Sequence, residues 1–434
     1  MPRFCLLLLL LCAQRVLAAE DREAFNHPLP DLSAGQQVQF FEGRTLMHQS
    51  WIVAPSQDTQ HDGLGPLYNQ LACSSCHPKN GRGRTPDRRD ERLQSALLRL
   101  SLPGPAGAAP RPHPAYGEQL NEQGIPGVPG EGSVFIDWQM QSLSLDDGQR
   151  LTLRRPRLRI VALAYGPLQG ALTSLRVGPT LIGMGLLDAV SDETLHAMAA
   201  EPKPDGVRGR VNQLRGEDGQ LRLGRFGLKA NAPNLRQQIA NAMLGDLGIS
   251  SSLHPQQNCR PAQRACRAAP TGGEPELSEA QLDALTRYLA LLQVPPARAA
   301  TPATRHGAQL FMRLGCALCH RPQLRSGAQA LAPQLAGQDF APYSDLLLHD
   351  MGESLADHRP DYEAGGRDWR TAPLWGIGRI KAINEHSQFL HDGRARDLQE
   401  AILWHGGEAQ TAQRRYRALS AQDREALLDF LRSL

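Results

Sequence analysis

The sequence predicts a mainly α-helical protein made of two tandem domains, each built around one Cys-x-x-Cys-His pentapeptide. The first pentapeptide spans residues 73–77 and the second spans residues 316–320. A capped helix with a leucine stripe follows each of them, near residue 280 and at the end of the chain, which indicates an internal repeat. Because far more residues lie between the first pentapeptide and its closing helix, we expect the first domain to carry insertions.

Each pentapeptide is the attachment signature of a c-type haem, in which two thiols bind the porphyrin vinyl groups and the next histidine ligates the iron. The predicted attachment residues are Cys73, Cys76, Cys316 and Cys319, and the predicted proximal iron ligands are His77 and His320. With 8 Cys and 14 His in 434 residues, roughly 0.005 accidental matches are expected. A zinc site is the alternative, but it would not explain a histidine after each cysteine pair. The sequence therefore predicts two covalently bound c-type haems.

Residues 1–18 have the features of a secretory signal peptide. A basic start at Arg3 precedes an unbroken leucine run from Leu6 to Leu11, and residues 16–18 offer a cleavage point. The apolar run is much shorter than the roughly 20 residues that cross a bilayer, and no later segment is apolar enough, so no membrane span is expected. Because c-type haem is attached outside the cytoplasmic membrane, the sequence predicts a periplasmic protein.

The first domain, residues 19–293, is expected to contain two insertions. Residues 102–132 are rich in Pro, Gly and Ala, which predicts an extended surface excursion. Residues 134–163 alternate apolar and polar side chains around Asp147 and Gly148, which predicts a small β-hairpin. The domain then closes with a helix over residues 277–289, capped by Ser278.

A proline-rich linker, residues 294–305, separates the two domains. The second domain, residues 306–434, begins with apolar residues at helical spacing directly before the second pentapeptide. It ends with a helix over residues 419–431, capped by Ser420. A first and a last helix that cross over the haem are usual in cytochrome c, so we expect both domains to be cytochrome c-like.

Two cysteines remain after the signal peptide and the haem sites are assigned, Cys259 and Cys266. In an oxidising compartment we expect them to form a disulfide that closes a polar surface loop. A redox-active pair is the alternative, but such pairs are more often spaced Cys-x-x-Cys.

The net charge of +3 is too small to indicate a nucleic-acid partner. A cluster of arginines follows the first pentapeptide, at Arg82, Arg84, Arg88, Arg89 and Arg92. The plain interpretation is a solvated loop. The alternatives are a docking patch for an acidic redox partner and contact with haem propionates.

Several stretches resemble one known family, and together they cover nearly all of the mature chain. They are residues 62–69, 183–188, 224–230, 345–352, 389–394 and 398–409. With them the chain resembles the di-haem oxidoreductase family of peroxidase-like proteins, also labelled thiol oxidoreductases, distant relatives of the bacterial di-haem cytochrome c peroxidases. The resemblance implies an oxidoreductase that passes electrons from the C-terminal haem to a reactive N-terminal haem. A non-catalytic electron carrier and an oxidant of a partner protein are the alternatives.

The resemblance also implies a distal ligand for the second haem. In the related peroxidases a helix after a His-Asp-Gly stretch carries a ligating methionine, and the same position here is His405. A packed histidine beside Trp404 is the alternative, and His391 is the first substitute. The distal ligand of the first haem stays open among Met47, His48, His61 and Met184.

Further expectations follow from the same resemblance. An acid or amide that moves a proton during peroxide cleavage is sought among Glu42, Gln70 and Asp188. A tryptophan between the haems is sought among Trp51, Trp375 and Trp404, and a weak calcium site near Thr371 and Pro373. His349 resembles a family-typical residue, with a propionate or interface contact as its plain role. The expected partner is a periplasmic redox protein of the small cytochrome or cupredoxin type.

Overall fold

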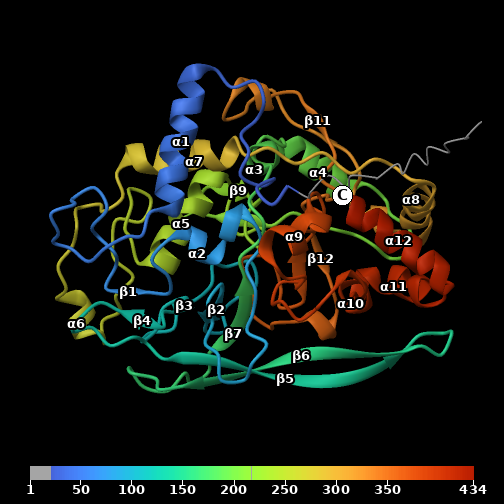
Figure 1. Cartoon of the computed structure of the whole chain (residues 1–434). Coiled ribbons are helices and arrows are strands. Elements are labelled where there is room, and N and C mark those ends of the chain that lie inside the picture. The colour runs from blue at the N-terminus through green and yellow to red at the C-terminus, as the bar shows by residue number, and fades with distance from the viewer. Residues whose placement is uncertain (1–20, 217) are drawn as a thin grey trace, which may run out of the picture.

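The computed structural model describes residues 21–216 and 218–434, and Figure 1 shows its elements. The predicted signal peptide, residues 1–18, lies outside the described residues. Helices make up 30% of the structure and strands 18%. The expectation of a mainly α-helical protein of tandem cytochrome c-like domains is therefore wrong. The insertions fold into small sheets, and much of the chain around the pentapeptides forms turns and very short helices.

The helices fall into two groups along the chain. The first half contains α1 (Ala34–His48), α2 (Cys73–Cys76), α3 (Met184–Asp188), α4 (Asp192–Ala200), α5 (Leu235–Leu247), α6 (Arg264–Arg267) and α7 (Glu279–Ala290). The second half contains α8 (Pro302–Leu314), the 3-10 helix η2 (Cys316–Leu318), α9 (Ile380–Asn384), α10 (Leu398–Leu403), α11 (Gln410–Arg417) and α12 (Ala421–Ser433). The helices predicted after the caps Ser278 and Ser420 are confirmed as α7 and α12, and each cap accepts a backbone hydrogen bond.

Two pairs of helices cross at a glycine. A Cβ atom at Gly43 of α1 would lie 2.1 Å from the carbonyl oxygen of Ala284 in α7. A Cβ atom at Gly307 of α8 would lie 2.0 Å from the carbonyl oxygen of Ala426 in α12. Any larger side chain would push either pair apart, so glycine allows this close approach. The first helix of each pair, α1 or α8, precedes one of the two pentapeptides in the sequence.

The strands form several small antiparallel sheets. A three-stranded sheet has β2 (Ala96–Ser101) between β3 (Gln119–Leu120) and β7 (Leu172–Val177), and a long hairpin joins β5 (Ser133–Ser144) to β6 (Arg150–Val161). The two-stranded pairs are β1 (Leu67–Tyr68) with β4 (Gln123–Gly124), β8 (Gln213–Arg215) with β9 (Leu221–Leu223), β10 (Leu324–Arg325) with β11 (Asp339–Phe340), and β12 (Leu348–Asp350) with β13 (Asp368–Arg370).

The predicted hairpin over residues 134–163 is present as β5 and β6, and it connects the two halves of the molecule. Figure 1 shows it running along the lower edge of the molecule as far as α10 and α11. Close to its turn, Arg424 of α12 donates a hydrogen bond to Asp147 at 2.5 Å. Arg417 of α11 donates to the carbonyl oxygen of Ser144 at 2.9 Å. The insertion therefore braces the C-terminal helices.

Residues 102–132 are more than the surface excursion that their composition predicts. They contain β3 and β4, and both Tyr116 and Leu120 are buried with Leu98, Leu100 and Val134 in a cluster of their own. Apolar side chains spaced among the prolines and glycines hold the segment against the sheet. The main core is separate and has members from residue 24 to residue 434, so both halves share it. The domain limits 19–293, 294–305 and 306–434 stay a prediction.

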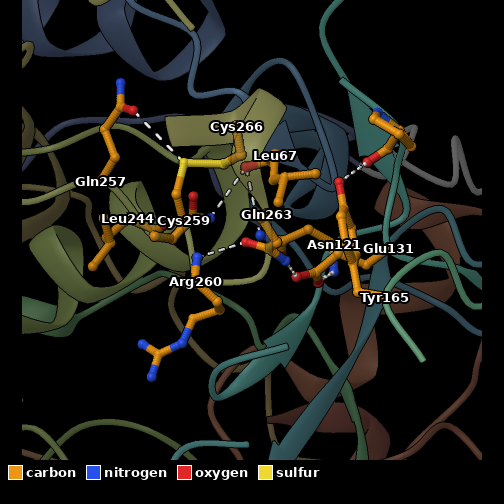
Figure 2. The surroundings of a disulfide bond; sticks show 12 residues. Leu67, Asn121, Glu131, Tyr165, Leu244, Gln257, Cys259, Arg260, Gln263 and Cys266 are labelled. Atoms are coloured by element: carbon orange, nitrogen blue, oxygen red, sulfur yellow. Dashed lines mark hydrogen bonds between the residues drawn. A yellow bond between two sulfur atoms is a disulfide. The ribbon is translucent and has the colours of Figure 1, made fainter. Parts of the chain in front are cut away.

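Cys259 and Cys266 form a disulfide that places a glutamine beside a buried carboxylate (Figure 2). Gln263, between the two cysteines, is fully buried and donates to Oε1 of Glu131 at 2.5 Å. The backbone N–H of Asn121 donates to Oε2 of Glu131 at 2.6 Å. Burial raises the pKa of Glu131 to about 8 and outweighs these hydrogen bonds, which lower it.

We expect the stability of the fold to decrease as the pH rises from about 5 to about 8. Glu131 has an ordinary pKa of 4.5 in the unfolded chain but keeps its proton to about pH 8 in the folded chain. The folded state therefore binds more protons across this window, and its stabilisation is lost as the pH rises. Denaturant unfolding at both ends of the window measures the effect. Glu131→Gln should weaken the dependence, and a variant that keeps all of it would contradict the assignment.

Candidate haem site

Both pentapeptides line one large cavity in the described structure. The cavity has a volume of about 390 Å³ and contacts Cys73 and His77 of the first pentapeptide and Cys316, Cys319 and His320 of the second. Cys76 does not line it, and its Sγ approaches the carbonyl oxygen of Gln94 at 3.8 Å. Most of the other lining side chains are aliphatic or aromatic. This cavity is far larger than the voids of ordinary packing. Its mostly apolar lining suits a flat apolar ligand.

The two cysteines of the first pentapeptide are the ends of the short helix α2, and its histidine makes a hydrogen bond to a distant backbone carbonyl. His77 Nδ1 lies 2.7 Å from the carbonyl oxygen of Pro179, so it carries the proton and donates. Burial lowers the pKa of His77, which keeps the ring neutral. Nε2 is then left with its lone pair, which is the arrangement of a metal-ligating histidine.

His320 of the second pentapeptide lies close to the imidazole ring of His405, with the two ring planes tilted by 48°. His320 Nδ1 donates to the carbonyl oxygen of Tyr343 at 2.9 Å, and His405 Nδ1 donates to that of Ala401 at 2.7 Å. The two ring centroids are 6.4 Å apart. Two imidazoles that bind one metal from opposite sides, each with a metal–nitrogen distance of about 2 Å, place their centroids about 6 Å apart. Burial, followed by the charge of His405, lowers the pKa of His320 to about 4.

The other predicted ligands divide into cavity-lining and remote residues. Met47, Met184 and His391 line the cavity. His61 and His48 do not, and His61 Nδ1 contacts the Asp58 carboxylate at 2.9 Å. No other ring lies close to His77 among the residues described, unlike the arrangement at His320.

Among the groups predicted to move protons, all three lie away from the cavity lining. Glu42 is exposed on α1, Gln70 donates to the carbonyl oxygen of Gln94, and Asp188 accepts from the N–H of Leu235. Gln238, which no sequence motif singled out, lines the cavity, and its half-buried side-chain amide makes no hydrogen bond within residues 21–216 and 218–434.

Gln238 has a sequence signal that could have identified it. The residues of α5 that line the cavity are Leu235, Gln238, Ile239, Ala242 and Met243. They follow the spacing of one helical face, and Gln238 is the lone polar residue in that apolar stripe.

The tryptophans predicted as relays are Trp51, Trp375 and Trp404, and all three are buried. Trp375 lines the cavity. Trp404 lies outside its lining and has the guanidinium of Arg394 4.7 Å from its ring centroid. Trp369, which the sequence analysis missed, lines the cavity but has the ammonium of Lys229 4.6 Å from its ring and His391 stacked on it at 3.7 Å. Nearby cations disfavour oxidation of an indole, so Trp375 is the best placed of the four for electron transfer.

Two arginines, Arg82 and Arg370, line the apolar cavity. Arg82 donates to the carbonyl oxygens of Gln388 and Leu390, and Arg370 donates to that of Gly227. Neither guanidinium forms an ion pair with any residue of the described chain. Burial lowers the pKa of both to about 10, which still leaves them charged at neutral pH. Two such cations fit the propionate groups of haem, so the cavity residues suit this cofactor.

The cavity wall behind Trp369 is a buried ionic cluster. Lys229 is fully buried and donates to Asp357 at 2.7 Å. Asp361 accepts from Arg176 at 2.9 Å and from Arg359 at 2.7 Å. The charged residues come from three segments, around residues 176, 229 and 360, and their ion pairs hold these segments together.

Two further expectations concern metals and membranes. Within residues 21–216 and 218–434, no three His, Cys, Asp or Glu side chains are grouped as a metal site. Thr371 and Pro373, the predicted calcium region, line the cavity. In the same residues no helix is both long and apolar enough to span a bilayer.

Comparison with known proteins gives one informative match. A family model described as "Di-haem oxidoreductase, putative peroxidase" matches residues 14–434. No curated relative matches the chain. A solved structure of hydrazine synthase from Kuenenia stuttgartiensis aligns over 100% of both chains, at 14% identity and a TM-score of 0.33. A similarity this weak carries no argument about fold or function.

Proposed function

This chain belongs to the di-haem oxidoreductase family, and from that premise we propose that it is a periplasmic c-type oxidoreductase with peroxidase-like activity. Residues 316–320 would hold the haem that receives electrons, and residues 73–77 would hold the haem at which they are used. The observation that carries the proposal is the unequal surroundings of the two histidines. His320 faces His405 at 6.4 Å, whereas His77 has no such ring partner in the described chain.

We infer covalent attachment from the two Cys-x-x-Cys-His pentapeptides, three of whose four thiols line the cavity. Burial raises the pKa of Cys73 and of Cys316 to about 12, so both are neutral thiols. Each thiol adds across one vinyl group, with sulfur bonded to one carbon and the hydrogen to the other. The same addition by Cys76, which does not line the cavity, and by Cys319 would attach each haem a second time. His77 and His320 would then ligate the irons through their neutral Nε2 atoms.

The different roles of the two haems would depend on whether a side chain of the protein occupies the sixth coordination position of each iron. When bound, haem supplies electron storage and peroxide cleavage. His405 would close the second site and favour electron storage there, and Trp375, which lines the cavity that both pentapeptides contact, would be the electron path. At the first site Gln238 can donate from Nε2 and accept at Oε1, so it can orient a peroxide and help to move its proton.

Periplasmic location and the electron donor are parts of the same proposal. The signal-like residues 1–18 and the disulfide between Cys259 and Cys266 both favour an oxidising compartment. Around the second pentapeptide, Arg321 pairs with Glu201 and Arg415 pairs with Asp205, while Arg313 of α8 and Arg414 of α11 are exposed. An acidic small cytochrome or cupredoxin fits this surface, and its rate of electron transfer should fall as salt increases.

Spectra of the fully ferric and half-reduced protein, followed by peroxide turnover, test the proposal. A high-spin component that changes on addition of peroxide supports catalysis at the first haem. Two low-spin haems that do not respond to peroxide or cyanide would instead make the protein an electron carrier.

Replacing Gln238 with leucine should lower peroxide turnover by about 10²–10³-fold without changing the haem content, because proton transfer loses its positioned amide. Gln237→Leu is the matched control, since Gln237 lies next to it on α5 and donates to Asn241 at 2.9 Å. Equal turnover in the two variants would remove Gln238 from the mechanism.

A further inference from the structure

A buried histidine lies between two carboxylates beside the second haem-binding pentapeptide. His349 of β12 is 1% exposed. Its Nδ1 lies 2.7 Å from Glu408 and its Nε2 lies 3.0 Å from Asp345. Burial alone would lower the pKa of His349, but its hydrogen bonds to Asp345, Cys319 and Glu408 raise it to about 12. The three side chains therefore carry one net negative charge inside the protein.

This cluster touches the haem attachment point directly. His349 Nδ1 lies 3.5 Å from Sγ of Cys319. The backbone N–H of Asp345 donates to the carbonyl oxygen of Cys319 at 2.9 Å. Both His349 and Glu408 line the cavity. A charge in this position acts on the second haem at short range and with little screening by water.

Glu408 also fixes the loop that carries His405. Its Oε2 accepts from the N–H groups of Arg208 at 2.9 Å and Gly209 at 3.1 Å, and its Oε1 accepts from Asp350 at 3.3 Å. Two separate segments, residues 208–209 and residues 349–350, thus hold Glu408, which lies three positions after His405. The hydrogen bonds to the carboxylate also lower the pKa of Glu408 to about 2 against the effect of burial, so it stays charged.

We propose that Glu408, His349 and Asp345 form a tuning site that lowers the reduction potential of the second haem, with Glu408 also positioning His405. The inference rests on the proposed function only in placing a haem at Cys316 and Cys319. A buried negative charge stabilises the ferric state, because ferric iron carries one more positive charge than ferrous iron. An electron stored at this haem is then more easily passed on.

Redox titration of the whole protein, followed by the absorption of each haem, tests the tuning site in Glu408→Gln and Asp345→Asn. Each variant removes one negative charge, while the remaining carboxylate keeps His349 protonated. At a fixed solution potential we expect the ratio of ferrous to ferric second haem to rise about tenfold, which equals about 59 mV for one electron. The first haem, which the cluster does not touch, should shift much less.

Glu425→Gln is the matched control, because Glu425 is an exposed carboxylate of α12 paired with Arg432. It should leave both potentials unchanged. If Glu408→Gln and Asp345→Asn leave the second potential unchanged or lower it, the tuning site is refuted. If one of these two variants fails to bind haem, the reduction potential measured in the other variant decides whether the tuning site exists. Absence of peroxide turnover in the wild type would refute the proposed activity but would leave this test intact.

Discussion

Replacing His405 with alanine is expected to turn one of the two haems from low-spin to high-spin. His405 Nδ1 is engaged by the carbonyl oxygen of Ala401, so its Nε2 is free to bind iron opposite His320. Without that imidazole the second iron loses its sixth ligand, and electron storage at this site should fail. Absorption and electron paramagnetic resonance spectra of the ferric protein measure the change.

Two controls separate ligand loss from general damage in the His405 variant. Added imidazole should bind in the space left by the side chain and restore the low-spin signal. His306→Ala removes a half-exposed histidine of the same half, paired with Asp423 at 2.6 Å, and should leave both spectra unchanged. A His405→Ala protein with wild-type spectra would show that His405 is only a packed histidine beside Trp404.

Replacing Asp361 with alanine is expected to lower the free energy of unfolding by about 3–5 kcal/mol, because it leaves buried charges without a partner. Asp361 is 1% exposed and is shared by Arg176 and Arg359, of which Arg359 is fully buried. The arginines that Asp361 neutralises hold its pKa at about 2 against burial, which by itself would raise it. Denaturant unfolding measures the loss.

The matched control for the Asp361 variant is Asp339→Ala. Asp339 pairs with Arg325 at 2.7 Å, but both side chains are exposed, and such pairs contribute little to stability. The control should unfold at the wild-type midpoint. An Asp361→Ala protein that also does so would show that the buried ionic cluster does not hold the cavity wall together.

The features that the sequence predicted well are local ones. The serine caps at residues 278 and 420 precede leucine stripes, and these residues form α7 and α12. The hairpin follows from alternating side chains around Gly148, which has a φ of 85° that glycine adopts easily. The two Cys-x-x-Cys-His pentapeptides are also local patterns, and covalent attachment of haem to them stays a prediction.

The features that the sequence analysis missed are assembled across the chain. β2 pairs with β7 in register from Ala96 with Val177 to Ser101 with Leu172, and no local pattern selects that partner. The same holds for Trp369, which packs between Lys229 and His391 from distant segments. The expectation of a mainly helical fold failed for this reason, since pairing between remote strands turned the insertions into sheet.

The mass of the denatured polypeptide tests most directly the central claim that one cavity holds two covalently bound haems. Denaturation releases any haem that is only packed in the cavity, so the remaining mass counts thioether-bound haem alone. We predict the mass of the chain that begins after the signal peptide plus that of two haems, and of one haem after Cys316 and Cys319 are both changed to serine. A wild-type mass with one haem or none would contradict the account.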